Sequence, residues 1–296
     1  GYAAGFFVAA ATYAVLGSHG WRAMMGLAVI PALLVWFIRR YVPEPPEIEA
    51  RIRARKDRKE CGDTTADGFV LRRLFDGALL RPTLICTALA TGSLIAFWSV
   101  STWYPQIIRQ MTATDEHSTA DHRVALASML FNAGGIIGYA SWGFLADAFG
   151  RRKTFALSFV VSAAAIAYVF PFDHSFRGFV VAMPILGFGL FGALSGTFIY
   201  GPEVFPPSVR ATALALVNSV GRFVTAAGPL VAGVIATSWF GGSLGLATAT
   251  IAAFGLIAFV GLAFARETRG KPMPMDPVPP HPTHTDTAIG REESHS

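Results

Sequence analysis

Long, uninterrupted apolar blocks divide the chain, and this patterning constrains its fold more than any other feature. A helix that crosses a membrane needs about 20 mostly apolar residues, and eight blocks approach or reach that length. The apolar residues are continuous and do not alternate with polar ones, which favours helices over the strands of a membrane barrel. The sequence therefore predicts an all-α membrane protein with eight transmembrane helices, at about residues 2–17, 22–41, 83–105, 124–147, 154–172, 178–201, 211–238 and 244–265.

Basic residues are shared unevenly between the segments that separate these blocks. Of the 24 Lys and Arg residues, 19 lie at 39–40, in 42–82, in the 151–153 turn, at Arg210 or after residue 265. The alternate connections hold only four, and positive residues accumulate on the cytoplasmic side of multi-pass proteins. We therefore expect the 42–82 loop and the tail to be cytoplasmic in a plasma or inner membrane. The net charge of +5 then reflects membrane topology and does not indicate nucleic-acid binding.

The chain reads as two helices, a polar insertion, six helices and a polar tail. Prolines after residue 42 stop the second helix. The spacing of Leu71, Leu74, Leu79 and Leu80 beside arginines predicts a helix along the membrane surface, within a cytoplasmic linker over 42–82. Residues 83–266 should form a six-helix bundle. Residues 267–296 contain many Pro, His and Thr, and we expect them to be disordered.

One acid and three bases lie in the turn between the fourth and fifth blocks. Residues 143–153 read Gly-Phe-Leu-Ala-Asp-Ala-Phe-Gly-Arg-Arg-Lys. This pattern closely resembles the cytoplasmic loop signature of the major facilitator superfamily of transporters. The resemblance implies a cytoplasmic latch that holds two helical bundles together in one state, to which Gly143, Asp147, Gly150, Arg151 and Arg152 would belong.

Three further stretches resemble the sugar and metabolite:proton symporter branch of the same superfamily. They are Val-Pro-Glu-Pro at 42–45, Pro-Glu-Val-Phe-Pro at 202–206 with Arg210 after it, and Glu-Thr-Arg-Gly at 267–270. All four motifs occur in family order. The resemblance implies a major facilitator-type helical bundle, here a fragment that corresponds to helices five to twelve of a twelve-helix carrier. Residues 1–41 would be the last two helices of the N-terminal bundle, and helices one to four would be absent.

The charged residues of these turns can also pair with one another. Asp147 ends one helix, and its carboxylate can accept from free N–H groups at the start of a neighbouring helix. Arg151, Arg152 and Arg210 can pair with Asp147 and Glu203. We expect such pairs to form and break as the carrier opens and closes; the alternative is plain membrane anchoring by positive charge.

Arg222 lies near the middle of the block 211–238, where inserting a charge costs about 2.5–3.5 kcal/mol. It should therefore face a wet cavity or a partner, and no Asp or Glu lies in the middle of any block. A guanidinium in a cavity can hold a carboxylate through two hydrogen bonds. The surrounding stretch also resembles helix eleven of organic-anion carriers, in which a matching arginine is implicated in anion binding. Alternatively, Arg222 is structural, bonded to backbone carbonyls or paired with an acid outside this sequence.

Three further residues are candidates for substrate contact. Asn132 and Asn218 lie in the middle of predicted helices, where an amide can hydrogen-bond a substrate or hold two helices together. Trp98 lies deeper than the Trp103–Tyr104 pair, which fits the interfacial aromatic belt, and could line a cavity.

The expected function is transport of a small organic anion of the carboxylate type, and the resemblance implies coupling to protons by symport. The run Gly187–Gly192 formally fits a dinucleotide-binding pattern, but no strand precedes it and close helix packing explains it better. We find no enzyme motif and no metal-ligand spacing, and so expect no catalytic residue, metal or cofactor. Two alternatives stay open: a carrier of a neutral sugar or drug, with Arg222 structural, or a receptor or scaffold that does not transport.

Overall fold

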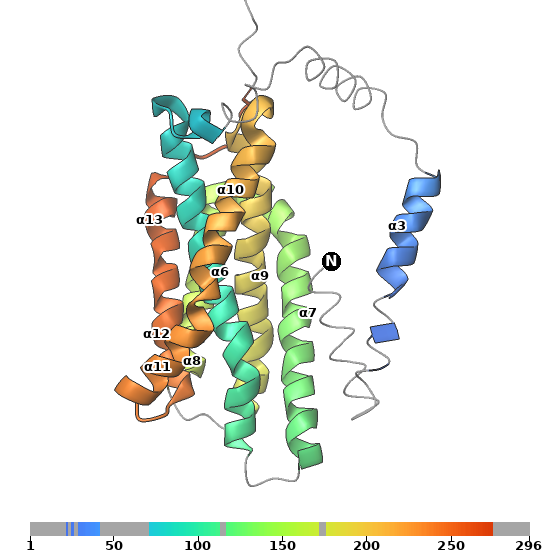
Figure 1. Cartoon of the computed structure of the whole chain (residues 1–296), viewed down its shortest axis with the longest axis vertical. Helices are drawn as coiled ribbons and strands as arrows, with labels where there is room; N and C mark the ends of the chain where they lie inside the picture. The colour runs from blue at the N-terminus through green and yellow to red at the C-terminus, as the bar shows by residue number, and fades with distance from the viewer. Residues whose placement is uncertain are drawn as a thin grey trace, which may run out of the picture.

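The computed structural model describes residues 22, 25–26, 29–41, 71–112, 117–171 and 176–274. All regular structure within these ranges is helical, as predicted, and Figure 1 shows most of it gathered in one upright bundle. The helices are α3 (Val29–Tyr41), α6 (Gly77–Met111), α7 (His117–Phe149), α8 (Arg151–Val169), α9 (Phe176–Val204), α10 (Pro207–Ala226), α11 (Gly228–Trp239), α12 (Leu244–Ala253), the short 3-10 helix η2 (Phe254–Leu256) and α13 (Ile257–Phe264).

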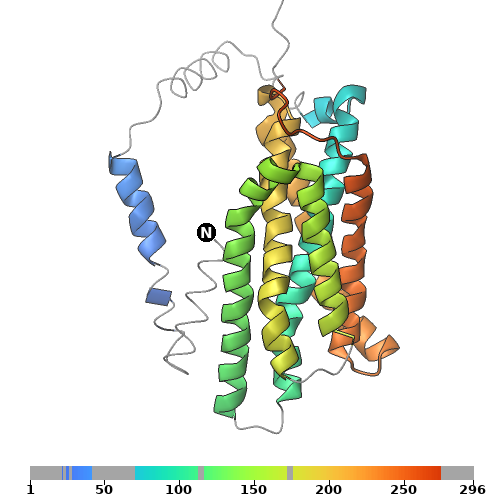
Figure 2. The same cartoon turned by 180° about the vertical axis from the view of Figure 1, so that it is seen from behind.

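Six segments of the described chain are long and apolar enough to cross a membrane. They follow the last six predicted blocks in order: Gly77–Met111, Thr119–Phe149, Arg151–Val169, Phe176–Val204, Pro207–Trp239 and Leu244–Phe264. The predicted number of eight is not reached, because the block 2–17 lies outside the described residues and the second block is represented by α3, which has only 13 residues. Figures 1 and 2 both draw α3 apart from the bundle.

Glycines let α7 and α9 touch backbone to backbone. A Cβ atom added at Gly187 of α9 would lie 1.9 Å from the carbonyl oxygen of Phe131, and one at Gly134 of α7 would lie 2.0 Å from that of Pro184. Real Cβ atoms cannot approach so closely, so only glycine fits at either position. Close packing is therefore confirmed as the reason for this glycine run, which lies within a helix and not after a strand.

Replacing Gly187 with alanine is expected to destabilise the bundle by about 3 kcal/mol, because α7 and α9 must separate to admit the methyl group. Gly233→Ala is the matched control, since a Cβ there meets nothing within 4 Å. Both substitutions replace a helical glycine with alanine and so raise helix propensity equally, which leaves packing as the difference between them. Thermal unfolding of the purified protein in detergent measures the difference, and equal melting temperatures for the two variants would contradict the packing argument.

Two of the predicted helices are interrupted. The block 211–238 forms α10 and α11, which meet at Ala227, because proline at position 229 has no N–H to donate and is accommodated in the first turn of a new helix. The block 244–265 is interrupted by η2, where the backbone of Gly255 lies against Gly92 of α6. Both interruptions matter because they lie beside the cavity described below.

Of the surface helix predicted within 42–82, the structure describes only the second half, where residues 71–74 form a helical turn of their own before α6. α6 begins at Gly77 and contains Leu79 and Leu80, and Pro82 lies inside the helix without ending it. Leu74 is fully buried in the core that also holds Trp142 and Phe205. Burial of Leu74 holds the turn that precedes α6 against the bundle. Residues 42–70 lie outside the described residues.

Candidate functional site

A cavity of about 760 Å³ lies between α6, α7, α9, the α10–α11 junction and the α12–η2 junction. Its volume falls within the range of small-molecule sites. Most of its lining is apolar, with aromatic side chains from four elements, α6, α7, α9 and η2: Phe97, Trp98, Trp103, Tyr139, Phe191, Phe198 and Phe254.

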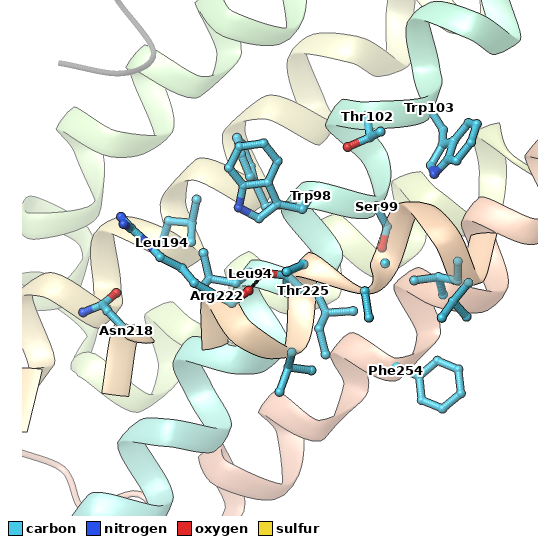
Figure 3. Close-up of a pocket in the computed structure, with 18 of the residues that line it drawn as sticks. Leu94, Trp98, Ser99, Thr102, Trp103, Leu194, Asn218, Arg222, Thr225 and Phe254 are labelled. Carbon is cyan, nitrogen blue, oxygen red and sulfur yellow. Dashed lines mark hydrogen bonds between the residues drawn. The ribbon is translucent and has the colours of Figure 1, made fainter. Parts of the chain in front are cut away.

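Arg222 is the only charged side chain among the described residues that line this cavity. Helix α10 places it four residues after Asn218, so both side chains lie on one face of the helix. Figure 3 shows the guanidinium extending past Leu194 toward the Asn218 side of the cavity. Within the described chain, this guanidinium has no hydrogen-bond or ion-pair partner, neither a carboxylate nor a backbone carbonyl.

The other candidate substrate contacts divide into two groups. Asn218 and Trp98 line the cavity, and one side-chain N–H of Asn218 donates to the carbonyl of Leu214 at 2.9 Å. Asn132 does not line it. The Asn132 side chain is buried, donates to the Ser128 carbonyl of its own helix at 2.8 Å, and keeps an unpartnered Oδ1.

A second site lies at the end of the bundle where α7 ends and α8 begins. Arg151 Nε donates to both carboxylate oxygens of Glu203 at 3.1 Å, and its Nη2 lies 2.7 Å from Oε1. Its Nη1 lies 2.7 Å from Asp147 Oδ1. The Arg151 and Glu203 side chains are only 14% and 15% exposed, whereas that of Asp147 is 72% exposed. The hydroxyl of Thr268 donates to Glu203 as well.

The acid that caps α8 is Glu267. Its carboxylate accepts from the backbone N–H of Arg151 at 2.8 Å and of Arg152 at 3.1 Å. Gly150 brings the chain into α8 with φ of 98°, and a Cβ on it would lie 2.8 Å from Glu267 Oε2. The Asp147 carboxylate pairs with the Arg151 side chain, and it makes no bond to the N–H groups at the start of a helix within the described residues. The segment after residue 266 is thus ordered at its start, contrary to prediction.

Other members of the predicted latch have different partners. Arg152 donates to the carbonyl of Ala263 at 3.4 Å, and Arg210 donates to that of Phe205 at 3.1 Å. Neither forms the predicted pair with Asp147 or Glu203 in the part of the chain that the structure describes. Nothing lies within 4 Å of a Cβ placed on Gly143, so packing within this bundle does not require a glycine there.

Sequence reasoning missed Tyr200, Glu267 and Thr268 as parts of this site. The Tyr200 hydroxyl donates to the Arg266 carbonyl at 3.0 Å and accepts from the Arg266 N–H at 3.1 Å, which holds the chain that carries Glu267. The Glu-Thr-Arg-Gly motif was a signal for Glu267 and Thr268. Nothing in the sequence marked Tyr200, because its role depends on the end of α13 lying beside α9.

Glu267→Gln is expected to lower the stability of the protein by about 1 kcal/mol at neutral pH, as loss of a helix cap does. Burial alone would raise the pKa of Glu267, but the backbone N–H donors outweigh it and lower this pKa below its ordinary value. A lowered folded-state pKa means that the stabilisation is complete above the ordinary carboxyl pKa of about 4.3 and is lost as pH falls through the folded-state pKa.

The difference in melting temperature between wild type and Glu267→Gln should therefore be constant from pH 6 to pH 8 and shrink in more acid solution. A difference that grows as pH falls would contradict the capping role.

Sequence comparison gives consistent matches. Residues 110–291 match the sequence model of the Major Facilitator Superfamily. The chain is 27% identical over 276 residues to the cis,cis-muconate transport protein of Acinetobacter baylyi, covering 92% of this chain and 63% of that protein. It is 29% identical over 264 residues to a probable 4-methylmuconolactone transporter of Cupriavidus pinatubonensis, covering 84% of this chain and 54% of that protein. It is 28% identical over 291 residues to an inner membrane metabolite transport protein of Escherichia coli, covering 90% of this chain and 60% of that protein. The chain thus spans between half and two thirds of the length of these relatives.

Proposed function

This chain belongs to the Major Facilitator Superfamily, which consists of membrane transporters and not of enzymes, and we propose that it acts as a secondary active transporter of small organic anions of the carboxylate class. Transport would proceed by alternating access, in which two bundles rock about a site near the membrane midplane.

One observation carries the choice of substrate class: Arg222 lies in an apolar cavity with no partner among the described residues. A carboxylate would supply the missing charge and accept two hydrogen bonds from the guanidinium. Asn218, one turn away, would add a donor or an acceptor. A neutral solute that covered the guanidinium would separate it from water without supplying a counter-charge, which is costly.

The names of the relatives support the same class, since two of them are described as carriers of muconate and methylmuconolactone. The identities are below 30%, so they support the class and not a particular compound.

The remaining features of the carrier follow from the family resemblance. Residues 1–41 would form two further membrane helices, bringing the total to eight. Residues 42–82 would be a cytoplasmic linker, 83–266 a six-helix bundle and 267–296 a cytoplasmic tail. The sites around Arg151 and Glu203 would form the cytoplasmic latch. A proton gradient would drive uptake. None of the described residues that line the cavity is an Asp or a Glu, so the group that carries the proton would lie elsewhere.

The experiment that tests the proposal compares uptake of matched charged and neutral solutes. The carrier, expressed from its complete coding sequence, is reconstituted in liposomes with an inward proton gradient. Benzoate and cis,cis-muconate are expected to compete for the site, at least one of them being taken up faster when the gradient is imposed. Benzamide should compete at least tenfold less well than benzoate, because it lacks the charge that Arg222 requires. Uptake of a neutral sugar, with no competition by any carboxylate, would overturn the proposal.

A further inference from the structure

Two hydroxyl groups of α6, those of Ser99 and Thr102, line the cavity without a hydrogen-bond partner in the described structure. Ser99 is buried as a residue and Thr102 is half-buried, but neither hydroxyl oxygen is among the fully buried atoms that lack a partner. Both hydroxyls are therefore accessible from the cavity. A hydroxyl that a ligand separates from water loses free energy unless the ligand bonds to it.

Neither hydroxyl makes the bond that is usual for its residue type in a helix. Serine and threonine in helices commonly donate to the carbonyl four residues earlier. In α6, Thr83, Thr87 and Ser93 do so at 2.7 Å each. Thr225, across the cavity on α10, also spends its hydroxyl on its own helix, at 3.0 Å from the Gly221 carbonyl. Ser99 and Thr102 make no such bond, so both can donate and accept within the cavity.

The polar groups of the cavity lie at two opposite ends. Figure 3 shows Arg222 and Asn218 on one side of the Trp98 ring, and Ser99 and Thr102 on the other. The space between these ends is bounded mostly by aromatic and aliphatic side chains. A ligand that reaches both ends would need a charged group, an apolar body and a second polar group, in that order.

We propose that Ser99 and Thr102 determine substrate specificity by binding a neutral hydrogen-bonding group, such as a hydroxyl, at the end of the substrate opposite to its carboxylate. This inference rests on the proposed function and narrows it to planar, apolar monocarboxylates that carry such a group. A second carboxylate would fit less well, because hydroxyls do not neutralise a charge and no second cation lines the cavity within the described residues. The site would thus differ in preference from a dicarboxylate carrier.

Competition by four rigid probes tests this order in the reconstituted carrier: benzoate, 3-hydroxybenzoate, 4-hydroxybenzoate and terephthalate, which has a carboxylate at each end. The better of the two hydroxybenzoates is expected to bind about three- to tenfold more tightly than benzoate, the effect of one neutral hydrogen bond. Terephthalate should bind more weakly than benzoate.

The double variant Ser99→Ala with Thr102→Val removes both hydroxyls with little change in shape. Affinity for the hydroxybenzoate should fall to that for benzoate, while affinity for benzoate stays unchanged and shows that the site is still folded. Thr237→Val is the control, because Thr237 bonds to its own helix and does not line the cavity. It should keep the preference.

The possible results are distinguishable. Equal affinity of the wild type for all three monocarboxylates, or tighter binding of terephthalate, would overturn the role of Ser99 and Thr102 and leave the carboxylate proposal standing. A double variant that keeps the hydroxyl preference would do the same. Failure of every carboxylate to bind the wild type would overturn both proposals.

Discussion

Replacing Arg222 with alanine is expected to lower the efficiency of carboxylate uptake by 100-fold or more, with no loss of the folded bundle. Each charge-assisted hydrogen bond contributes about 1.5–3 kcal/mol, and a guanidinium can make two of them to one carboxylate. A factor of ten corresponds to about 1.4 kcal/mol. The side chain is exposed to the cavity and has no partner in the described chain, so its loss removes no structural contact that the bundle needs.

Two measurements make this test specific. The melting temperature of Arg222→Ala should stay within about 2 °C of wild type, since the substitution removes a charge from apolar surroundings. Arg222→Lys should restore part of the uptake, because a lysine keeps the charge but cannot bind a carboxylate through a planar fork. Unchanged uptake in Arg222→Ala would show that the cavity does not bind its substrate through this charge.

The second large effect concerns Arg151 and Glu203. Glu203→Gln is expected to destabilise the described bundle by about 2 kcal/mol, because it leaves the largely covered Arg151 guanidinium without its main counter-charge. Asp147→Asn should cost less than about 1 kcal/mol, since the Asp147 side chain is 72% exposed and its ion pair is weakened by water. Thermal unfolding in detergent measures both.

The comparison between these two acids is the useful part of the test. Both pair with Arg151 at 2.7 Å, so distance alone predicts equal effects. Burial predicts a much larger effect for Glu203. If Asp147→Asn proved the more damaging of the two, the contact made by Asp147 would have to lie outside the described residues, on a second bundle.

The helices could be predicted from the sequence because their signal is local. An apolar run of 20 residues has few stable forms in a bilayer, and the last six runs correspond to the six candidate spans. The ends of the helices were less predictable. α6 starts at Gly77, earlier than the predicted block, and Leu74 just before it is buried among side chains from distant parts of the chain. The hydropathy of 71–82 does not reveal that contact.

The sequence predicted which charged residues belong to the site, but not which of them bond to one another. Arg222 was conspicuous because a charge within an apolar helix is rare, and Glu203 and Arg151 were marked by their motifs. Asp147 was predicted to accept from the start of a neighbouring helix, whereas the acid found at the start of α8 is Glu267, which lies 116 residues beyond Arg151. Ser99 and Thr102 carried no signal at all, because serine and threonine are common in membrane helices and only the surrounding bonds show which hydroxyls are free.

The direct contact between the backbones of α7 and α9 also limits how the protein can move. Side chains can change rotamer to let two helices slide, but a carbonyl against a glycine Cα has no such freedom. In a conformational cycle, α7 and α9 would therefore move together as one rigid unit. Bending would be left to the two interrupted segments, α10–α11 at Ala227 and α12–α13 at η2, both of which lie beside the cavity.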